Sequence, residues 1–322
     1  MEKQMKAAVL HRFGGPEEFQ IEQVPVPQAA SNEVLIKLQY SAVSTWDAFE
    51  RQGGYAEMLG MQPIFPYILG SEGAGTIVDI GKDVAQFKLG DSVYTASFLN
   101  ANGGTYAEYV AVGAEYVSLI PKPLGMKEAS TILGVGITAL RGLENVLNLQ
   151  KGETILILGA SGGVGHMAVQ LAKLMGAEVI AVASGDDGVN LVQQLGIEKV
   201  VNGRSENALE QIKALVPHGV DSALFTAGGK LAQDLLELVR NEGRVAYPNG
   251  VQLDVNTTAN IKVSAYNGEP EGEIMARLSR YIESEAVTVH IAKKFQLEEI
   301  QAAHKALAGH YSGKLIVGID HE

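Results

Sequence analysis

A glycine-rich turn between a strand and a helix constrains this 322-residue chain more than any other feature of its sequence. The apolar run 154–158 predicts a buried strand, and Gly159-Ala-Ser-Gly-Gly-Val-Gly165 follows it directly. Residues 163–175 then repeat apolar side chains at helical spacing, and Gly176 ends the predicted helix. Such glycines let backbone N–H groups approach a pyrophosphate at a helix N-terminus. The sequence therefore predicts a dinucleotide site; the competing interpretation is that the glycines serve only helix–strand packing.

The same alternation of strand and helix continues after the turn. Apolar strands are predicted at 154–158, 178–183, 199–201, 222–226 and 244–247, with amphipathic helices between them. Apolar strands separated by helices indicate a doubly wound parallel sheet.

The chain changes character near residue 123. Before that point, short β-branched runs lie between Gly and Pro turns, which is typical of an all-β, barrel-like unit. We therefore predict an α/β protein with two domains. One comprises residues 1–123 together with 262–322, and the dinucleotide-binding domain comprises residues 124–261.

Composition excludes several classes of protein. The net charge of −12 and the lack of a basic patch argue against nucleic acid as a partner. The sequence has no cysteine, which excludes disulfides and cysteine-ligated metals. No apolar run approaches the roughly 20 residues that a bilayer span needs, and the first residues do not form a signal peptide. We expect a soluble, cytoplasmic protein without membrane contact.

The end of the second predicted strand bears on which dinucleotide is bound. Enzymes that use NAD usually place a carboxylate there, whereas this chain has Ala183 followed by Ser184. A small residue and a hydroxyl leave room for a 2′-phosphate, and Arg204 is a candidate partner for it. Asp186 and Asp187 follow closely and argue the other way. NADPH is favoured, with NADH as the alternative.

Several motifs resemble one family over nearly the whole chain. They are Ile68-Leu-Gly-Ser-Glu-Gly-Ala-Gly75, Phe87-Lys-Leu-Gly-Asp-Ser-Val93, Gly103-Gly-Thr-Tyr-Ala-Glu-Tyr-Val110, Gly136-Ile-Thr-Ala139 and the glycine turn. The sequence is similar to the medium-chain dehydrogenase/reductase superfamily, in its zinc-independent quinone oxidoreductase (ζ-crystallin-like) branch. The resemblance implies a GroES-like catalytic domain, a Rossmann domain, a cleft between them, and a homodimer.

The cofactor site follows partly from the turn and partly from the resemblance. Thr138 matches a threonine near the nicotinamide in such relatives, although a helix-interior threonine bonded to its own backbone is the alternative. Residues 227–228 and Asn249 end strands at the sheet edge that faces ligands. Lys314 is predicted either to reach the cofactor or to lie on the surface. Gly188 and Gly203 stand where many NADPH-binding relatives carry Lys and Tyr. The predicted contacts are Thr138, Gly159, Ser161, Gly162, Gly163, Val164, Ser184, Arg204, Ala227, Gly228, Asn249 and Lys314.

Two positions argue against zinc. Ser44 stands where zinc alcohol dehydrogenases carry their first cysteine ligand, and Ser71 replaces the histidine of their Gly-His-Glu motif. We therefore predict no metal site. Without a Lewis acid, alcohol oxidation loses its usual mechanism, whereas hydride transfer to an already electrophilic acceptor remains feasible.

Reduction of a conjugated acceptor needs hydrogen-bond donors beside the developing oxyanion. The candidates are Ser44, Thr45, Tyr55 and Tyr67, of which Tyr55 is expected on a glycine-rich loop. Tyrosines packed with their hydroxyls in water are the competing interpretation. Ser44 and Phe49 replace an Asn and a Tyr of ζ-crystallin-like relatives.

His166 is expected on a helix surface, and the acidic run 269–273 is expected in a solvated turn. We predict an NADPH-dependent, zinc-independent reductase of quinones or other conjugated carbonyl compounds. The alternatives are a 2-alkenal or enoyl reductase and a non-catalytic, NADPH-binding redox sensor.

Overall fold

The computed structural model describes residues 3–257, 260–284 and 287–319, which divide into two compact units. Unit 1 comprises Met1–Leu133, Pro270–Ala276 and His290–Glu322. Unit 2 comprises Gly134–Glu269 and Arg277–Val289.

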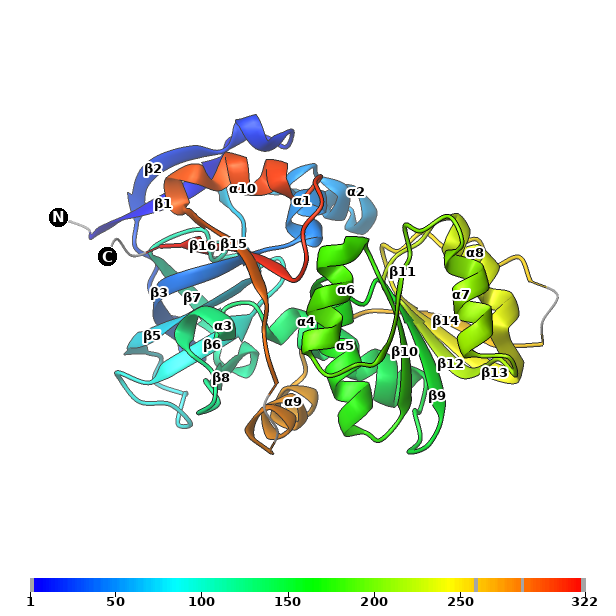
Figure 1. Ribbon diagram of the computed structural model, residues 1–322. Helices are drawn as coiled ribbons and strands as arrows, with labels where there is room; N and C mark the ends of the chain where they lie inside the picture. Colours follow the sequence, from blue (N-terminus) through cyan, green and yellow to red (C-terminus); the bar gives the residue numbers. More distant parts are fainter. Residues whose placement is uncertain (1–2, 258–259, 285–286, 320–322) are drawn as a thin grey trace. The chain divides into compact units, whose positions relative to one another are not determined.

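Unit 1 is built on two β-sheets (Figure 1). The larger has the order β15-β16-β3-β5-β6-β8, with β7 paired to β3, and the smaller has the order β2-β1-β4. Their bounds are β1 (Gln4–Leu10), β2 (Gln20–Pro25), β3 (Glu33–Val43), β4 (Tyr67–Ile68), β5 (Glu72–Ile80), β6 (Ser92–Ala96), β7 (Tyr109–Gly113), β8 (Val117–Leu119), β15 (Ile291–Gln296) and β16 (Lys314–Gly318).

The strand β1 shows why this unit holds together. Its alternate side chains enter two separate apolar clusters: Ala8 and Leu10 join the main core, and Met5, Ala7 and Val9 form a second cluster with Ala107. All of them are at most 2% exposed. Because strand side chains alternate between faces, β1 is buried on both sides. The β-sheet architecture predicted for this unit is confirmed, but the unit also contains helices and is not all-β.

Short helices accompany the strands of unit 1. They are α1 (Thr45–Arg51), α2 (Gly54–Leu59), α3 (Met126–Ala129) and α10 (Ile300–Ala306). The glycine-rich segment predicted as a loop around Tyr55 is the helix α2. Gly53 (φ 85°) precedes this helix and Gly60 (φ 65°) follows it, both in the left-handed conformation. The two glycines therefore mark the ends of a helix and do not indicate a flexible loop.

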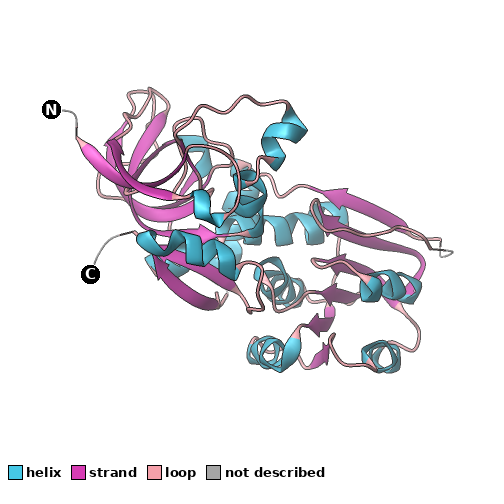
Figure 2. Cartoon of the chain, turned by 90° about the horizontal axis from the view of Figure 1, so that it is seen from above, coloured by secondary structure: helices cyan, strands magenta, loops and turns pink. Residues whose placement is uncertain are grey.

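Unit 2 contains a six-stranded sheet with the order β11-β10-β9-β12-β13-β14, and every pair in it is parallel. In Figure 1 the helices α5 and α6 lie on one side of this sheet, and α7 and α8 on the other; Figure 2 shows the same strands in magenta. The bounds are β9 (Thr154–Leu158), β10 (Glu178–Ala183), β11 (Lys199–Asn202), β12 (Val220–Phe225), β13 (Val239–Pro248), β14 (Lys262–Tyr266), α4 (Leu133–Leu140), α5 (Gly163–Leu174), α6 (Gly185–Gln194), α7 (Ala208–Leu215), α8 (Lys230–Leu235) and α9 (Gly272–Ser284).

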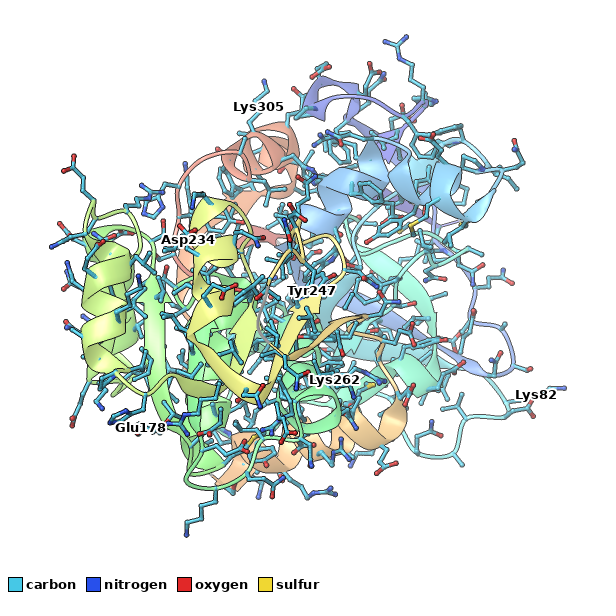
Figure 3. The ribbon with its side chains drawn as sticks, turned by 90° about the vertical axis from the view of Figure 1, so that its right-hand side faces the viewer. Lys82, Glu178, Asp234, Tyr247, Lys262 and Lys305 are labelled. Atoms are coloured by element: carbon cyan, nitrogen blue, oxygen red, sulfur yellow. The ribbon has the colours of Figure 1, made fainter. Side chains whose placement is uncertain are left out.

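The predicted doubly wound sheet is confirmed. The central strands carry continuous apolar runs, such as 155–158 and 179–183, because helices cover both faces, and Leu156 and Ile180 are fully buried. The exposed charges Glu178 and Lys262 begin β10 and β14 (Figure 3). Among the described residues, no helix combines the length and apolar character needed to cross a bilayer.

Three elements of unit 2 differ from the sequence pattern. The strand predicted at 244–247 begins earlier, at Val239, which already pairs with Val220 in the sheet, so the helix α8 before it ends at Leu235. The pattern did not predict β14, because only Tyr266 of its five residues is buried and the strand lacks the continuous apolar run of the central strands. The acidic run 269–273 leads directly into α9 instead of forming only a turn.

Tight contact between β3 and β5 gives a test of unit 1. A Cβ atom at Gly75 would lie 2.0 Å from the backbone oxygen of Lys37, whereas a Cβ at Gly272 would meet nothing within 4 Å. We predict that Gly75→Ala lowers the stability of the protein by about 2 kcal/mol or more, since the strands must separate to admit the methyl group. Thermal unfolding of Gly75→Ala and of the control Gly272→Ala measures this. Equal melting temperatures would contradict the tight packing.

Candidate functional site

The glycine turn leaves an open cradle at the start of α5. Gly159 has a left-handed φ of 81°, which favours glycine. A Cβ at Gly165 would lie 2.0 Å from the Gly159 oxygen, so Gly165 lets the helix approach the strand. At Gly162, the N-cap of α5, the nearest atom to an added Cβ is 3.4 Å away. Two glycines therefore serve folding, and the third leaves space beside the N-terminus of α5.

The ends of β10 and β11 are joined by a residue that the sequence reasoning missed. Asn202 Oδ1 accepts hydrogen bonds from the backbone N–H groups of Gly185 (3.1 Å) and Arg204 (3.0 Å). Its Nδ2 donates to the Asp186 carboxylate at 2.9 Å. The Ser184 N–H donates to Ser161 Oγ at 3.2 Å. This polar edge brings the predicted residues Ser161, Ser184 and Arg204 into one neighbourhood of unit 2.

The glycines at 188 and 203 are explained by packing. A Cβ at Gly188 would lie 2.6 Å from Ser161 Oγ, and one at Gly203 would lie 2.9 Å from Val182 Cγ1. The Lys and Tyr of many NADPH-binding relatives would therefore require this edge to shift.

The other predicted cofactor residues of unit 2 have separate surroundings. Thr138 Oγ1 donates to the Gly134 carbonyl at 2.8 Å, which is the local backbone bond that the alternative interpretation describes. A Cβ at Gly228 would lie 2.1 Å from the Gln252 oxygen, so this glycine packs against the segment after β13. Ala227 is exposed, and Asn249 Nδ2 donates to Asn267 Oδ1 at 2.6 Å.

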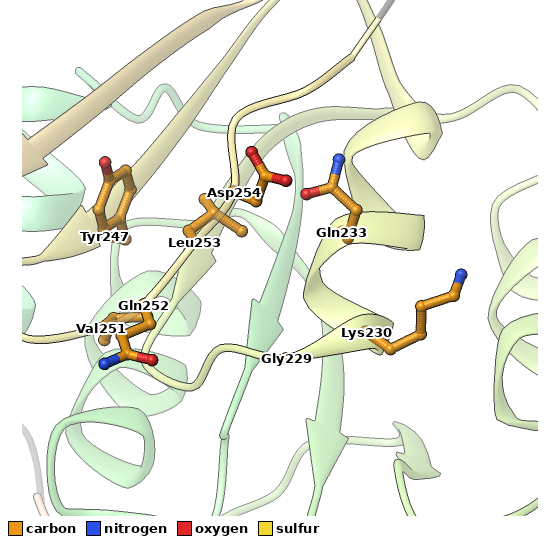
Figure 4. Close-up of a pocket in the computed structure, with 8 residues that line it drawn as sticks. All are labelled: Gly229, Lys230, Gln233, Tyr247, Val251, Gln252, Leu253 and Asp254. Atoms are coloured by element: carbon orange, nitrogen blue, oxygen red, sulfur yellow. The ribbon is translucent and has the colours of Figure 1, made fainter.

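A hollow of about 690 Å³ adjoins Gly228 at the carboxyl ends of β12 and β13. Gln233 on α8 and Asp254 on the facing segment point toward one another across it (Figure 4). Gln233 Oε1 is buried and has no hydrogen-bond partner among the described atoms. The lining residues are Gly229, Lys230, Gln233, Tyr247, Val251, Gln252, Leu253 and Asp254.

Unit 1 contains a second arrangement, a buried polar cluster of Ser44, Asp47, Ser71, Glu72 and Lys314, here called the barrel cluster. Each of the five residues is at most 4% exposed. The antiparallel register of β16 and β3, in which Leu315 pairs with Val43, brings the start of β16 beside Ser44.

Lys314 is held inside this cluster by three contacts. Its Nζ donates to Ser44 Oγ at 2.7 Å and lies 3.4 Å from Glu72 Oε2 and 5.0 Å from the centre of the Trp46 ring. The surface position that was one interpretation of Lys314 is therefore wrong. A buried ammonium needs such partners, because desolvation without them costs several kcal/mol.

Asp47 is the most heavily hydrogen-bonded carboxyl of the barrel cluster. Its Oδ2 accepts from the Ser44 N–H (2.8 Å) and the Tyr106 hydroxyl (3.0 Å), and its Oδ1 accepts from Ser71 Oγ (3.1 Å). Burial, reinforced by the nearby Glu50 carboxyl, raises the pKa of Asp47 to about 7, and the hydrogen bonds from Ser44 and Tyr106 oppose this. Asp47 therefore titrates near neutral pH.

A histidine and an arginine extend the network from Asp47. His304 Nε2 lies 3.2 Å from the Tyr106 hydroxyl, and His304 Nδ1 lies 2.9 Å from Arg51 Nη1. Burial, with help from the Arg51 charge, lowers the pKa of His304 to about 3, so its ring is neutral at pH 7. The sequence reasoning missed these residues because they lie far apart along the chain.

The remaining oxyanion candidates of unit 1 have different surroundings. The Tyr67 hydroxyl donates to Glu50 Oε1 at 2.5 Å, and burial raises its pKa. Tyr55 stacks edge-on against Phe49, with ring centres 4.8 Å apart. Thr45 is exposed at the start of α1. Only Ser44 of the four candidates belongs to the barrel cluster.

The sequence predicts His166 on a helix surface, but the residue is fully buried. Its Nδ1 lies 2.9 Å from the Gly162 carbonyl oxygen, one turn back along α5. The apolar side chains of α5 recur at the predicted helical spacing, but the buried face of this helix is wider than these side chains and includes His166.

Comparison with known proteins gives matches to both units. Residues 30–122 match the family "Alcohol dehydrogenase GroES-like domain", and residues 163–264 match "Zinc-binding dehydrogenase". A quinone oxidoreductase of Mus musculus is 30% identical over 97% of this chain and 96% of its own. The chain belongs to the medium-chain dehydrogenase/reductase superfamily.

Relatives in this superfamily carry two kinds of name. An alcohol dehydrogenase of Schizosaccharomyces pombe is 33% identical over 80% of this chain and 78% of its own. The solved structure of a quinone oxidoreductase from Coxiella burnetii covers 99% of this chain with all of its own, at 25% identity and a TM-score of 0.84. The GroES-like and Rossmann-like folds predicted from the sequence are thus confirmed, and the protein is an oxidoreductase of this superfamily.

The name of one matched family implies zinc, which the barrel cluster does not fit. The two positions compared with zinc ligands carry the hydroxyls of Ser44 and Ser71, and the ammonium of Lys314 lies against Ser44. Zinc is bound in proteins by thiolate, imidazole and carboxylate groups, and a cation repels it. Within the described ranges, no three His, Asp or Glu side chains are grouped for a metal ion.

The raised pKa of Asp47 predicts how stability depends on pH. Since the folded-state pKa of about 7 exceeds the ordinary value of 3.8, folding favours the protonated acid, and this stability is lost as pH rises from about 4 to 7. The loss approaches about 1.4 kcal/mol per pH unit within this window. We predict a smaller loss for Asp47→Asn, whose amide does not ionise. Urea unfolding at several pH values between 4 and 8 compares the two proteins; an unchanged pH dependence would contradict the assignment.

Proposed function

We propose that this protein reduces quinones or other conjugated carbonyl compounds with NADPH and does so without zinc. The observation that carries the proposal is the barrel cluster, in which the Lys314 ammonium lies 2.7 Å from the hydroxyl of Ser44. A hydroxyl and a cation suit the stabilisation of negative charge on an acceptor oxygen. They do not suit alcohol oxidation, in which a metal ion binds the alcohol as its alkoxide.

The cofactor part of the proposal rests on the glycine turn. The open space at Gly162 and the amides of Gly163 and Val164 at the start of the 12-residue helix α5 fit a pyrophosphate. Ser184 and the exposed side chain of Arg204 would hold a 2′-phosphate. When bound, NADPH supplies the hydride. The carboxylate of Asp186 is bonded to Asn202, which reduces its repulsion toward such a phosphate.

The acceptor part of the proposal has support from apolar side chains on unit 1. Phe49 on α1 is 43% exposed, and Met58 and Leu59 on α2 are 64% and 55% exposed. Together with Tyr55 these side chains offer an apolar surface of the kind that flat aromatic quinones bind.

Oxidation of NADPH and NADH with a panel of acceptors tests the proposal. The panel holds 1,4-benzoquinone, 9,10-phenanthrenequinone, an alkenal and a simple aldehyde, after treatment with EDTA. We predict turnover with the quinones or the alkenal that resists EDTA and prefers NADPH. Activity with the aldehyde alone, or loss of activity in EDTA, would contradict it. Tight NADPH binding without any turnover would favour the redox-sensor alternative.

The glycine turn gives a second prediction. Gly162→Asp places a carboxylate where the pyrophosphate would lie, and charge repulsion should weaken NADPH binding at least about 100-fold. Gly272→Asp is the matched control, because it adds the same carboxylate away from the turn, where a Cβ meets nothing within 4 Å. Calorimetric titration of the two variants measures the difference. Equal affinities would rule out this turn as the pyrophosphate site.

A further inference from the structure

We propose that Lys314 is a positioning residue that acts through Ser44. In this inference, which rests on the proposed function, the Lys314 ammonium holds the Ser44 hydroxyl oxygen, so that the hydroxyl proton is donated to the oxygen of the bound acceptor. The role differs from the cofactor contact that the sequence predicts for Lys314, because it needs no contact between Lys314 and the dinucleotide.

The hydrogen-bonding capacities of the two groups define the direction of this contact. An ammonium has three protons and no lone pair, so Lys314 Nζ is the donor and Ser44 Oγ the acceptor over their 2.7 Å separation. A serine hydroxyl has one proton of its own, which this contact does not use. Among the described residues no acceptor for that proton is found, and the Asp47 carboxyl oxygens accept from the Ser44 backbone N–H and from the Tyr106 and Ser71 hydroxyls.

The position of the ammonium is set by groups on two other elements of unit 1. Glu72 Oε2, at the start of β5, lies 3.4 Å from Lys314 Nζ, and the Trp46 ring of α1 lies 5.0 Å from it. Trp46 Nε1 is fixed in turn by a 2.7 Å hydrogen bond to Ser71 Oγ. The side chain of Lys314 is 4% exposed and that of Glu72 is 1% exposed, so solvent does not screen the pair.

A fixed cation against the Ser44 oxygen has a chemical consequence. It withdraws electron density from the O–H bond and strengthens the hydrogen bond that the hydroxyl donates to an oxyanion. This hydrogen bond strengthens as negative charge develops on the acceptor oxygen. It therefore stabilises the transition state more than the ground state, which is the condition for a faster reaction. Lys314 thus provides positive charge to the acceptor oxygen through one hydroxyl.

Because this chain contains no cysteine, the effect of the Lys314 charge on a group at position 44 can be measured directly with an introduced thiol. Ser44→Cys introduces the only thiol of the protein, and its thiolate is titrated by ultraviolet absorbance. We expect its pKa to be lower by about one unit or more than the pKa of the same thiol in Ser44→Cys/Lys314→Met, since a cation in contact favours the thiolate. Lys305→Met in the Ser44→Cys background is the matched control, because Lys305 is an exposed lysine of unit 1 (Figure 3). Equal thiol pKa values with and without Lys314 would overturn the proposal.

Removal of Lys314 leaves Glu72 buried without its cation, which can unfold the domain. Glu72→Gln is therefore combined with Lys314→Met in a second set of variants, and circular dichroism shows that each protein is folded. The thiol pKa is expected to shift in both sets, because the shift depends on the charge of Lys314.

A kinetic cycle tests whether the coupling serves the reaction. We expect Ser44→Ala and Lys314→Met each to lower kcat with a quinone about tenfold or more, and the double variant to be no slower than either single one. NADPH affinity should be unchanged in all three. Additive losses would overturn the proposal, and a loss of NADPH affinity in Lys314→Met alone would assign Lys314 to the cofactor.

If the unmodified protein oxidises NADPH with no acceptor, the proposed function fails, and with it the role in the reaction. The thiol titration still decides whether Lys314 polarises position 44.

Discussion

The interaction on which the site of unit 1 depends is the contact between a buried ammonium and a buried hydroxyl, Lys314 and Ser44, beside the carboxylate of Glu72. Charge in a protein interior is tolerated only when other groups replace the lost water. Here a carboxylate, a hydroxyl and an aromatic ring replace it within about 5 Å. The pairing of β16 with β3 holds these groups together, so the fold of the unit and the charge at its centre stabilise one another.

The glycine turn of unit 2 follows the opposite principle, since it positions no charged side chain at all. Gly165 permits close approach of helix and strand, and Gly162 leaves open the space beside the N-terminus of α5. Partial positive charge at a helix N-terminus suits an anion that arrives with the cofactor. A fixed side-chain cation in unit 1 suits charge that develops only during the reaction. The proposed function assigns these two kinds of site to cofactor and acceptor.

Sequence reasoning predicted what is local and missed what depends on distant contacts. The strand, turn and helix at 154–175 lie within one short segment, and both fold classes followed from such patterns. The Lys314–Ser44 and Arg51–His304 contacts join residues 270 and 253 positions apart, so no local period reveals them. The helix α9 was within reach, since Ile274, Leu278 and Ile282 recur every four residues and are buried. The acidic residues before it favoured a turn instead.

The central claim is that a lysine ammonium is fixed inside the barrel cluster, against Ser44. Correlation of lysine Nζ with its protons by nuclear magnetic resonance tests this directly, because exposed ammonium groups lose their signals through rapid exchange with water. We predict one slowly exchanging lysine signal near neutral pH that disappears in Lys314→Met and shifts in Ser44→Ala. A spectrum without a protected lysine signal, or with one that Ser44→Ala leaves unchanged, would contradict it.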